Sequence, residues 1–233
     1  MGGEREYQHE FSEIHPKTMF DEPGRLQKAR KTVAVILDAL RQAGIDPRET
    51  RLLDIGCSTG ILTRHYAEFF GEVVGIDIDD GAVDWARKNR ATENVSYRIG
   101  DSMEVPFPTA EFDLVTCTHI YEHVPDAQRM MDEIHRVLRP GGFCFFAAEN
   151  RLRVWDGHYN LPFVTVLPRP LADIYVRVTG RGQRRYETHR TLWGLERLVR
   201  AFEVTDYTRA VVRDPEKFEA TDMILPLSLI HIS

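Results

Sequence analysis

The sequence predicts an α/β protein with one doubly wound, mostly parallel sheet that helices cover on both faces. Short apolar runs alternate with helical patterns between residues 51 and 148, as in consecutive βαβ units. Those runs are apolar at almost every position, which is typical of strands buried on both faces of a parallel sheet. The first run leads directly into a glycine-containing turn, LLDIGCSTG, at the place where such sheets bind ligands.

The predicted elements follow one another in a regular order. A helix comes first, because apolar residues recur at spacings of three and four from Leu26 to Ala43, and Gly44 follows as a C-cap. The predicted strands are RLLDIG, EVVGID, VSYRIG, FDLVTCT and GFCFFAA. Helical patterns such as DDGAVDWARKNR and PDAQRMMDEIHRVL separate them, so right-handed crossovers are expected. Near the end, TLWGLERLVRAF predicts a helix, and EVTDYTRAVV (203–212) predicts a further strand.

Composition and charge limit the classes of function. A chain of 233 residues with 42% hydrophobic and 28% charged residues suits one globular domain. The net charge of −6 argues against a nucleic-acid partner, because phosphate binding needs clustered Lys and Arg. The cysteines Cys57, Cys117 and Cys144 lie far apart, which predicts neither a thiolate zinc site nor a disulfide framework and favours the cytoplasm. No run approaches the ~18 apolar residues of a membrane span, and the start lacks a signal-peptide pattern.

Acidic residues end three successive predicted strands. Asp54 precedes Gly56 and Gly60 in the first turn, Asp77 ends the second strand about 20 residues later, and Asp101 ends the third. Glycines in such a turn allow a ligand to approach the backbone, and the second acid is placed to accept hydrogen bonds from ribose hydroxyls. A single Asp at such a position most often caps a helix or a turn. The set of three is a more specific indication of a nucleoside-binding site.

These motifs resemble the class I S-adenosylmethionine-dependent methyltransferases, within the type 11 group that includes quinone-biosynthesis enzymes. The resemblance covers residues 52–148 through LDIGCSTG, GIDID, GDSMEVPFP, FDLVTCTHIYEHVPD and LRPGG. It implies a Rossmann-like fold, methyl transfer and S-adenosyl-L-methionine as cofactor. The implied cofactor-binding residues are Asp54, Gly56, Cys57, Ser58 and Gly60 for the methionine part, Asp77 and Ile78 for ribose and adenine, Asp101 and Ser102 for the adenine edge, and Thr118. Ser58 stands where the family more often has glycine.

The segment after the resembling core differs from it in composition. From residue 151 to 189 the periodicity weakens and Pro, Gly and Arg accumulate, which indicates an excursion from the sheet, a lid. It resembles the substrate-side insertion of a bacterial subgroup that accompanies envelope-polysaccharide genes. His158 and Tyr159 form a polar pair among apolar residues there, so they are candidate substrate contacts. The stretch Arg169–Arg190 has six arginines against one Asp and one Glu, which suits an anionic group or membrane surface, although a solvated loop also explains it.

The chain is expected to form one methyltransferase domain over residues 1–226. Its parts are an N-terminal helical cap (1–47), a cofactor-binding core (48–150), the substrate-side insertion (151–189) and a C-terminal helix and strand (190–226). Residues 227–233, LSLIHIS, contain no Asp, Glu, Lys or Arg and resemble a translated adapter sequence. We therefore expect a non-native tail and a missing last strand.

The stretch His119-Ile-Tyr-Glu-His123 allows two interpretations. It fits H-x-x-E-H, a spacing found in zinc peptidases, but zinc needs a third protein ligand, which the sequence does not identify. No metal is therefore expected. On the methyltransferase interpretation His119 follows the fourth strand, where methyl group and acceptor meet, and it is a candidate general base with an ordinary pKa near ~6.5. It could equally hydrogen-bond the cofactor or cap the next turn, while His123 supports the turn.

The sequence thus favours a methyltransferase acting on a small-molecule or lipid and envelope-intermediate acceptor, most simply on oxygen. A non-catalytic cofactor-binding module and a zinc hydrolase are the alternatives. The chain has no G-x-x-x-x-G-K-[ST] for a phosphate loop, and GCSTGI lacks the middle glycine of the nicotinamide fingerprint. Tyr7, Met19 and Phe20 are expected to fold over the cofactor from the N-terminus.

Overall fold

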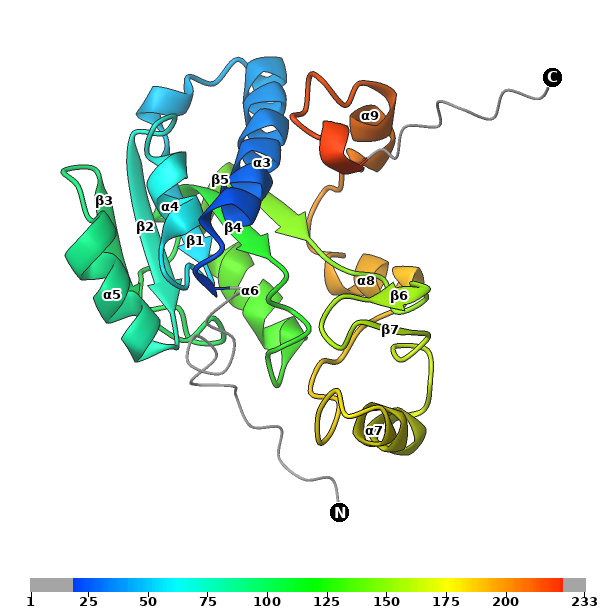
Figure 1. Cartoon of the computed structure of the whole chain (residues 1–233). Coiled ribbons are helices and arrows are strands. Elements are labelled where there is room, and N and C mark those ends of the chain that lie inside the picture. The colour runs from blue at the N-terminus through cyan, green and yellow to red at the C-terminus, as the bar shows by residue number, and fades with distance from the viewer. Residues whose placement is uncertain (1–18, 224–233) are drawn as a thin grey trace.

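The computed structural model describes residues 19–223 as a central sheet with helices on both faces and a smaller region beside it (Figure 1). The sheet has five parallel strands in the order β3-β2-β1-β4-β5. They are β1 (Arg51–Ile55), β2 (Glu72–Asp77), β3 (Val95–Ile99), β4 (Phe112–Thr118) and β5 (Leu138–Ala147). The predicted doubly wound α/β fold is confirmed. Because the chain reverses direction across the sheet after β3, the switch point lies between β1 and β4.

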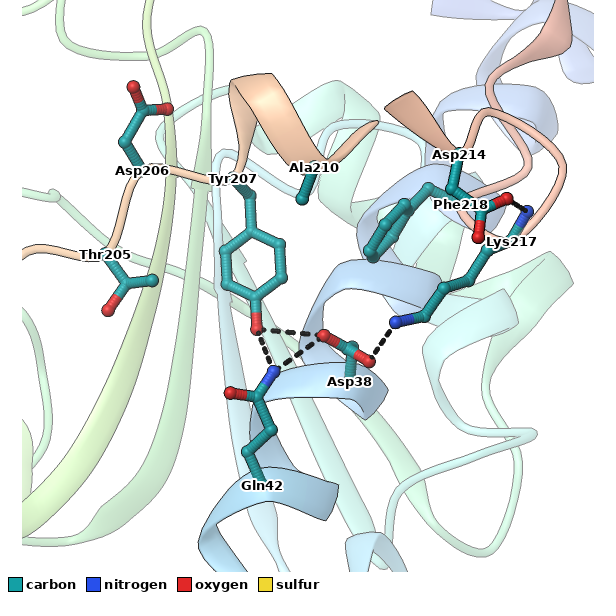
Figure 2. A pocket seen from close by; sticks show the side chains of 9 residues that line it. All are labelled: Asp38, Gln42, Thr205, Asp206, Tyr207, Ala210, Asp214, Lys217 and Phe218. Atoms are coloured by element: carbon teal, nitrogen blue, oxygen red, sulfur yellow. Dashed lines mark hydrogen bonds and ion pairs between the residues drawn. The ribbon is translucent and has the colours of Figure 1, made fainter. Parts of the chain in front are cut away.

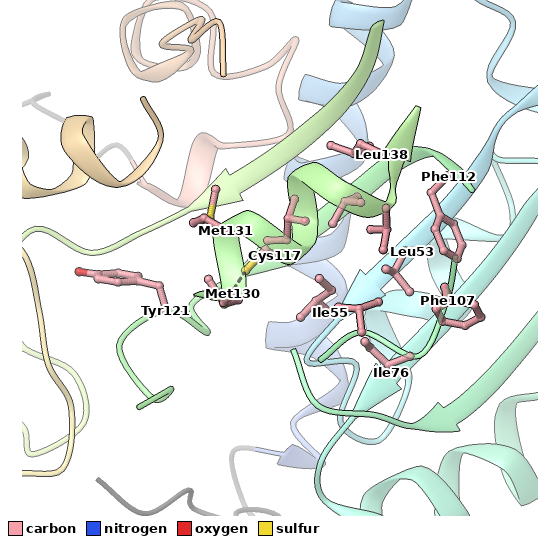
Figure 3. Packing of buried hydrophobic residues seen from close by; sticks show 14 of the residues in the cluster. Leu53, Ile55, Ile76, Phe107, Phe112, Cys117, Tyr121, Met130, Met131 and Leu138 are labelled. Carbon is pink, nitrogen blue, oxygen red and sulfur yellow. Dashed lines mark hydrogen bonds between the residues drawn. The ribbon is translucent and has the colours of Figure 1, made fainter. Parts of the chain in front are cut away.

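Alternate residues of each strand supply two separate cores. Leu52 and Leu114 face α3 (Glu22–Ala43), α4 (Ile61–Tyr66) and α5 (Asp80–Arg90). Leu53 and Val115 face α6 (Ala127–Val137) and α8 (Leu192–Leu198) on the other side, where Figure 3 shows Leu53 and Ile55 packed near Met130. The strands β1, β2 and β4 are therefore buried on both faces, which explains their continuous apolar runs, whereas the edge strand β3 is exposed at alternate positions.

The helices begin where the sequence provides caps. The side chains of Asp21, Asp79 and Asp126 accept hydrogen bonds from backbone N–H groups in the first turns of α3, α5 and α6. Gly44 ends α3 in the left-handed conformation at a φ of 72°, which confirms the predicted C-cap. A short 3₁₀ turn, η1 (Pro47–Glu49), leads from α3 to β1.

The predicted insertion forms a small unit beside the sheet. It contains a hairpin of β6 (Trp155–Asp156) and β7 (Leu161–Pro162), followed by α7 (Arg169–Val178). Its own buried cluster consists of Tyr159, Leu161, Val164, Ala172 and Val176. In Figure 1 this unit lies at the side of the molecule away from β3, next to α8.

The strand predicted over residues 203–212 is not formed. The chain is extended there and then forms α9 (Thr208–Arg213), with a 3₁₀ turn η2 (Thr221–Met223) further on. Its apolar residues Tyr207, Ala210 and Val211 are partly buried against Val35 of α3, Phe218 and Phe145 of β5, without forming a strand. The predicted tail, 227–233, lies outside the described residues.

A shallow pocket of about 300 Å³ lies between α3 and α9 (Figure 2). Its polar groups bind one another: Asp38 accepts hydrogen bonds from Gln42 at 2.8 Å and from Tyr207 at 3.2 Å, and pairs with Lys217 at 2.7 Å. These contacts attach the C-terminal segment to α3. The pocket is on a different part of the molecule from the carboxyl ends of the strands.

No helix within residues 19–223 combines the length and the apolar character needed to cross a bilayer.

Candidate active site

The carboxyl ends of β1, β2 and β4 meet at one edge of the sheet. Ile55 of β1 pairs with Ile76 of β2 on one side and with Cys117 of β4 on the other. The turn after β1 therefore lies between the end of β2, at Asp77, and the end of β4, at Thr118. An open parallel sheet binds its ligand at this kind of edge.

The turn after β1 depends on its glycines. Gly56 and Gly60 have φ angles of 77° and 73°, in the left-handed region. A Cβ on Gly56 would lie 2.1 Å from Cδ1 of Ile120, and a Cβ on Gly60 would lie 2.6 Å from the ring of Tyr97. Ser58, where the family more often has glycine, also has a positive φ of 49°. The turn is thus held in a conformation that side chains rarely adopt.

Asp77 binds this turn from the end of β2. Its Oδ2 accepts a hydrogen bond from the backbone N–H of Ser58 at 2.7 Å, and its Oδ1 accepts one from Asp79 at 3.0 Å. Burial raises the pKa of Asp77, while these N–H groups oppose the shift. A carboxylate offers about four acceptor sites, so ribose hydroxyls can bind beside the two backbone donors.

Asp54 has a different environment from the one predicted. Its two oxygens accept hydrogen bonds from the hydroxyls of Thr63 at 2.6 Å and Thr116 at 2.7 Å, and the side chain is buried. These two bonds and the burial of the carboxylate give Asp54 a role in holding the turn and β4 together, and its contact with the methionine part of the cofactor stays a prediction. Burial raises the pKa of Asp54 to about 6.

This raised pKa predicts a pH-dependent stability. The unfolded carboxyl loses its proton near its ordinary pKa and the folded one only near 6, so the free energy of unfolding is expected to fall as pH rises across that interval. The loss should amount to about 3 kcal/mol. The Asp54→Asn variant should not show this pH-dependent part of the free energy of unfolding, because asparagine does not ionise. Denaturant titrations of both proteins at several pH values across this window check it, and a wild-type minus variant difference that is independent of pH would contradict it.

The N-terminal end of the described chain covers the turn. The carbonyl oxygen of Met19 accepts a hydrogen bond from Oγ1 of Thr59 at 2.9 Å, and its sulfur accepts one from Oγ of Ser58 at 3.1 Å. Met19 therefore contacts the turn, and its predicted position over the cofactor stays a prediction. Phe20 packs against the ring of Trp85. Tyr7 lies outside the described residues.

Arg25 is a site residue that the sequence reasoning missed. Nη1 of Arg25 donates to the sulfur of Met19 at 3.7 Å, and its Nε is buried without a hydrogen-bond partner within residues 19–223. Burial lowers the pKa of Arg25, while the charges of Asp54 and Asp77 oppose that shift. A half-buried cation beside this turn is available to an anionic ligand group. Its only sequence signal is its position directly before Leu26, where the apolar face of the first helix begins.

The predicted adenine residues lie at the end of β3, beside Asp77. Oδ1 of Asp101 accepts a hydrogen bond from the backbone N–H of Met103 at 2.6 Å, and Ser102 is buried. Asp101 lines an open hollow of about 570 Å³ together with Gly100 and residues 104–108. Ile78 is partly buried directly after Asp77. Of the predicted adenine residues, Asp101 thus lines a hollow that an adenine ring could enter.

The remaining cofactor candidates differ in accessibility. Thr118, at the end of β4, has a buried Oγ1 without a hydrogen-bond partner in the described chain, so it can bind a ligand in the turn. Cys57 is fully buried and packs against Gly75, where a Cβ would lie 2.8 Å from that of Cys57. Burial raises the pKa of the Cys57 thiol well above its ordinary value. Cys57 therefore supports the turn from inside the protein.

His119 follows β4 and faces two carboxylates. Its Nδ1 lies 3.7 Å from Oε1 of Glu122 and 4.0 Å from Oε1 of Glu149. Its backbone N–H donates to Ala147 at 2.9 Å, and its φ of 57° is in the left-handed region. The side chain is 38% exposed at the carboxyl edge of the sheet.

The two predicted substrate contacts have separate environments. The hydroxyl of Tyr159 donates to the carbonyl of Arg184 at 3.2 Å and accepts from the N–H of Tyr186 at 3.0 Å, inside the core of the lid. This geometry gives Tyr159 a structural role in the lid, and its contact with a substrate stays a prediction. The ring of His158 lies 5.3 Å from that of His123 and 6.0 Å from that of His189, measured between centroids. His158 therefore faces the turn after β4.

Comparison with known proteins relates the chain to methyltransferases. The family model described as methyltransferase domain matches residues 53–146. A demethylmenaquinone methyltransferase of Staphylococcus aureus is 32% identical over 173 residues, which cover 70% of each chain. A ubiquinone biosynthesis O-methyltransferase of Coxiella burnetii is 36% identical over 103 residues, 43% of this chain and 44% of that protein. The match thus spans less than half the length of that relative.

A solved structure supports the fold alone. An S-adenosylmethionine-dependent methyltransferase of Methanosarcina mazei superposes with a TM-score of 0.53 at 21% identity, over 66% of this chain and 79% of that one.

Proposed function

Because the chain belongs to the class I S-adenosylmethionine-dependent methyltransferases, we propose that it transfers a methyl group to an oxygen atom of a small-molecule or lipid-linked acceptor. The observation that carries this proposal is one shared edge of the sheet. The glycine turn and Asp77 lie at the ends of β1 and β2, and His119 follows the neighbouring β4. A cofactor site and a base for its acceptor are thereby adjacent.

The residues at this edge fit the cofactor. Two buried polar atoms near the turn, Nε of Arg25 and Oγ1 of Thr118, have no hydrogen-bond partner among the described residues. Arg25 is suited to the carboxylate of the methionine part, because a guanidinium binds carboxylates strongly. Asp77 is suited to the ribose hydroxyls and the hollow beside Asp101 to adenine.

Methyl transfer needs alignment and one proton acceptor. The bound cofactor supplies a methyl group on a positively charged sulfur, which leaves as a neutral thioether. A C–S bond breaks, a C–O bond forms, and the hydroxyl proton of the acceptor must be removed. With Nδ1 held towards Glu122 and Glu149, Nε2 of His119 is the nitrogen that would take this proton. The other residues hold the reacting atoms in line.

The names of the relatives suggest an acceptor class. One is a demethylmenaquinone methyltransferase, and another is an O-methyltransferase of ubiquinone biosynthesis. Quinone-type acceptors have an aromatic head with oxygens and a long apolar tail. A lid with its own apolar core beside the site is consistent with such an amphipathic acceptor.

We further propose that α7 docks on an anionic membrane surface. Leu171, Ile174 and Val178 share one face of the helix and are 54%, 55% and 80% exposed, while the opposite face is buried in the lid. Arg177 lies in the last turn, and Arg181 follows it. Apolar side chains with flanking arginines are typical of interfacial helices.

Vesicle binding tests this docking. The change Leu171→Glu with Ile174→Glu is expected to weaken binding to phosphatidylglycerol vesicles by at least about tenfold, because two apolar anchors become charged. Binding to phosphatidylcholine vesicles should be weak for both proteins. A control is Val212→Glu on α9, which places a charge at an exposed apolar position outside α7. Equal vesicle binding by the double variant and the control would contradict the proposal.

The proposed function itself is tested in two steps. Calorimetric titration with S-adenosylhomocysteine measures the cofactor site, and a circular dichroism spectrum verifies that the protein is folded. A labelled methyl donor then tests transfer to demethylmenaquinone and to hydroxylated quinone precursors with short tails. Labelled O-methyl product supports the proposal, whereas labelled carbon-methyl product would correct the position of transfer. Cofactor binding without any product would favour the alternative of a non-catalytic binding module.

A further inference from the structure

Three segments that are far apart in the sequence meet beside His119. They are the turn after β4, the start of the lid after β5, and the stretch before α8. The backbone N–H of Thr188 donates to the carbonyl of Glu122 at 2.8 Å. The hydroxyl of Tyr121 donates to the carbonyl of Glu149 at 2.5 Å and accepts from the N–H of Arg190 at 3.1 Å. These contacts place the side chains of all three segments around one point.

Histidines and carboxylates gather at this point. Ligand atoms of Glu122, His123 and His158 all lie within 4.8 Å of one another. A second set, Glu149, His158 and His189, meets the same condition and shares His158. Imidazole nitrogen and carboxylate oxygen are the usual ligands of zinc and related divalent ions. Rotation of side chains would be needed to reach metal-ligand bonds of about 2.0–2.2 Å.

Glu122 supplies a second, independent observation. Its side chain is fully buried, and neither of its oxygens has a hydrogen-bond partner in the described part of the chain. The nearest ring nitrogen, Nδ1 of His119, is 3.7 Å away, which is longer than a hydrogen bond. Nδ1 of His189 is likewise buried without a hydrogen-bond partner there. Buried polar atoms of this kind are costly unless a ligand or an ion satisfies them.

The charges around the cluster favour a cation. Glu122, Glu149, Asp156 and Glu187 surround the histidines. Arg153 pairs with Glu149 and with Asp156, the latter at 3.4 Å. Arg185 also interacts with Glu187, so two arginines stand against four acidic residues in the described chain. The remaining negative excess is one that a divalent ion would reduce.

We propose that Glu122, His123 and His158 bind one divalent transition-metal ion, for which zinc is the best probe, with His189 on the other side of the His158 ring. The two histidines of the H-x-x-E-H motif thus have different roles. His123 binds the ion, and His119 contacts the methyl acceptor. The third ligand comes from the hairpin of the lid. The ion would connect the lid to the turn after β4. This inference concerns metal binding and does not depend on the proposed methyl transfer.

Titration of the metal-free protein tests the site directly. Tag-free full-length protein, treated with a chelator and dialysed, is titrated with zinc chloride in a calorimeter, and bound metal is then measured by mass spectrometry. One equivalent of zinc is expected to bind. His158→Gln and Glu122→Gln should each weaken the affinity by at least about tenfold. The matched control is His135→Gln, which changes an exposed histidine on α6 outside the cluster.

The outcomes separate this proposal from the proposed function. Absence of zinc binding in wild-type protein that binds S-adenosylhomocysteine overturns the metal site and leaves the methyltransferase assignment intact. Unchanged zinc affinity in His158→Gln also overturns it. Because His158 lies in an exposed hairpin, this variant is expected to fold even if Glu122→Gln does not. Zinc binding that is lost in His158→Gln and kept in His135→Gln supports the site.

Discussion

Replacing Asp77 with alanine is expected to weaken the binding of S-adenosylhomocysteine by about ten- to hundredfold. Hydrogen bonds to a charged group contribute about 1.5–3 kcal/mol each, and 1.4 kcal/mol corresponds to a factor of ten. The variant also loses the acceptor for the N–H of Ser58, 2.7 Å away, so the glycine turn becomes less ordered. Calorimetric titration of wild type and variant under the same conditions measures the ratio of dissociation constants.

Two further variants define what Asp77 contributes. Asp77→Asn keeps an acceptor for the backbone of Ser58 and is expected to bind with intermediate affinity. Asp84→Ala removes an aspartate on α5 that pairs with Arg87 at 3.0 Å at the surface, and it should bind as wild type does. Circular dichroism verifies the fold of each protein. If folded Asp77→Ala binds within threefold of wild type, the assigned ribose contact is incorrect.

Replacing His119 with asparagine is expected to lower kcat by about 10²–10⁴-fold, which is the usual contribution of a general base. Asparagine is the appropriate replacement because it tolerates the left-handed conformation of this residue, with its φ of 57°. The affinity for S-adenosylhomocysteine should change little, because the proposed role concerns the proton of the acceptor. Initial rates with the acceptor identified in the screen measure kcat and KM separately.

The pH profile distinguishes a base from a structural histidine. A dependence of kcat on pH that arises from proton transfer to His119 should be present in the wild type and absent in His119→Asn. The control His135→Asn should keep both the rate and the profile. A His119→Asn enzyme that retains the wild-type dependence of kcat on pH would show that another group accepts the proton.

Local patterns in the sequence were sufficient for most of the fold. The apolar runs, the spacing from Leu26 to Ala43 and the caps at Gly44 and Asp79 determine where strands and helices begin and end, because they act over a few residues. The glycine turn and Asp77 could be located for the same reason, since strand ends in a parallel sheet lie at one edge.

The prediction of a last strand failed where the packing partner was distant in the sequence. The β-like pattern around Tyr207 and Val211 fits a strand, yet these residues are partly buried against α3 and form no strand. The hydroxyl of Tyr159 donates a hydrogen bond within the lid, to the backbone carbonyl of Arg184, more than twenty residues away in the sequence. The sequence pattern around a residue does not predict which part of the protein that residue will pack against.

Side-chain periodicity and turn chemistry are local in the sequence. They were enough to predict the order of the helices and strands, the edge of the sheet that binds ligands, and the acidic residues at the strand ends on that edge. Tertiary structure alone brings Arg25 to the glycine turn, and His158 and His189 to Glu122 and His123. These long-range contacts depend on the path of the chain through loops and the lid. No repeating sequence pattern in those segments predicts which residues come into contact. The physical reason is that packing joins residues by surface complementarity and burial, which act across any separation in sequence.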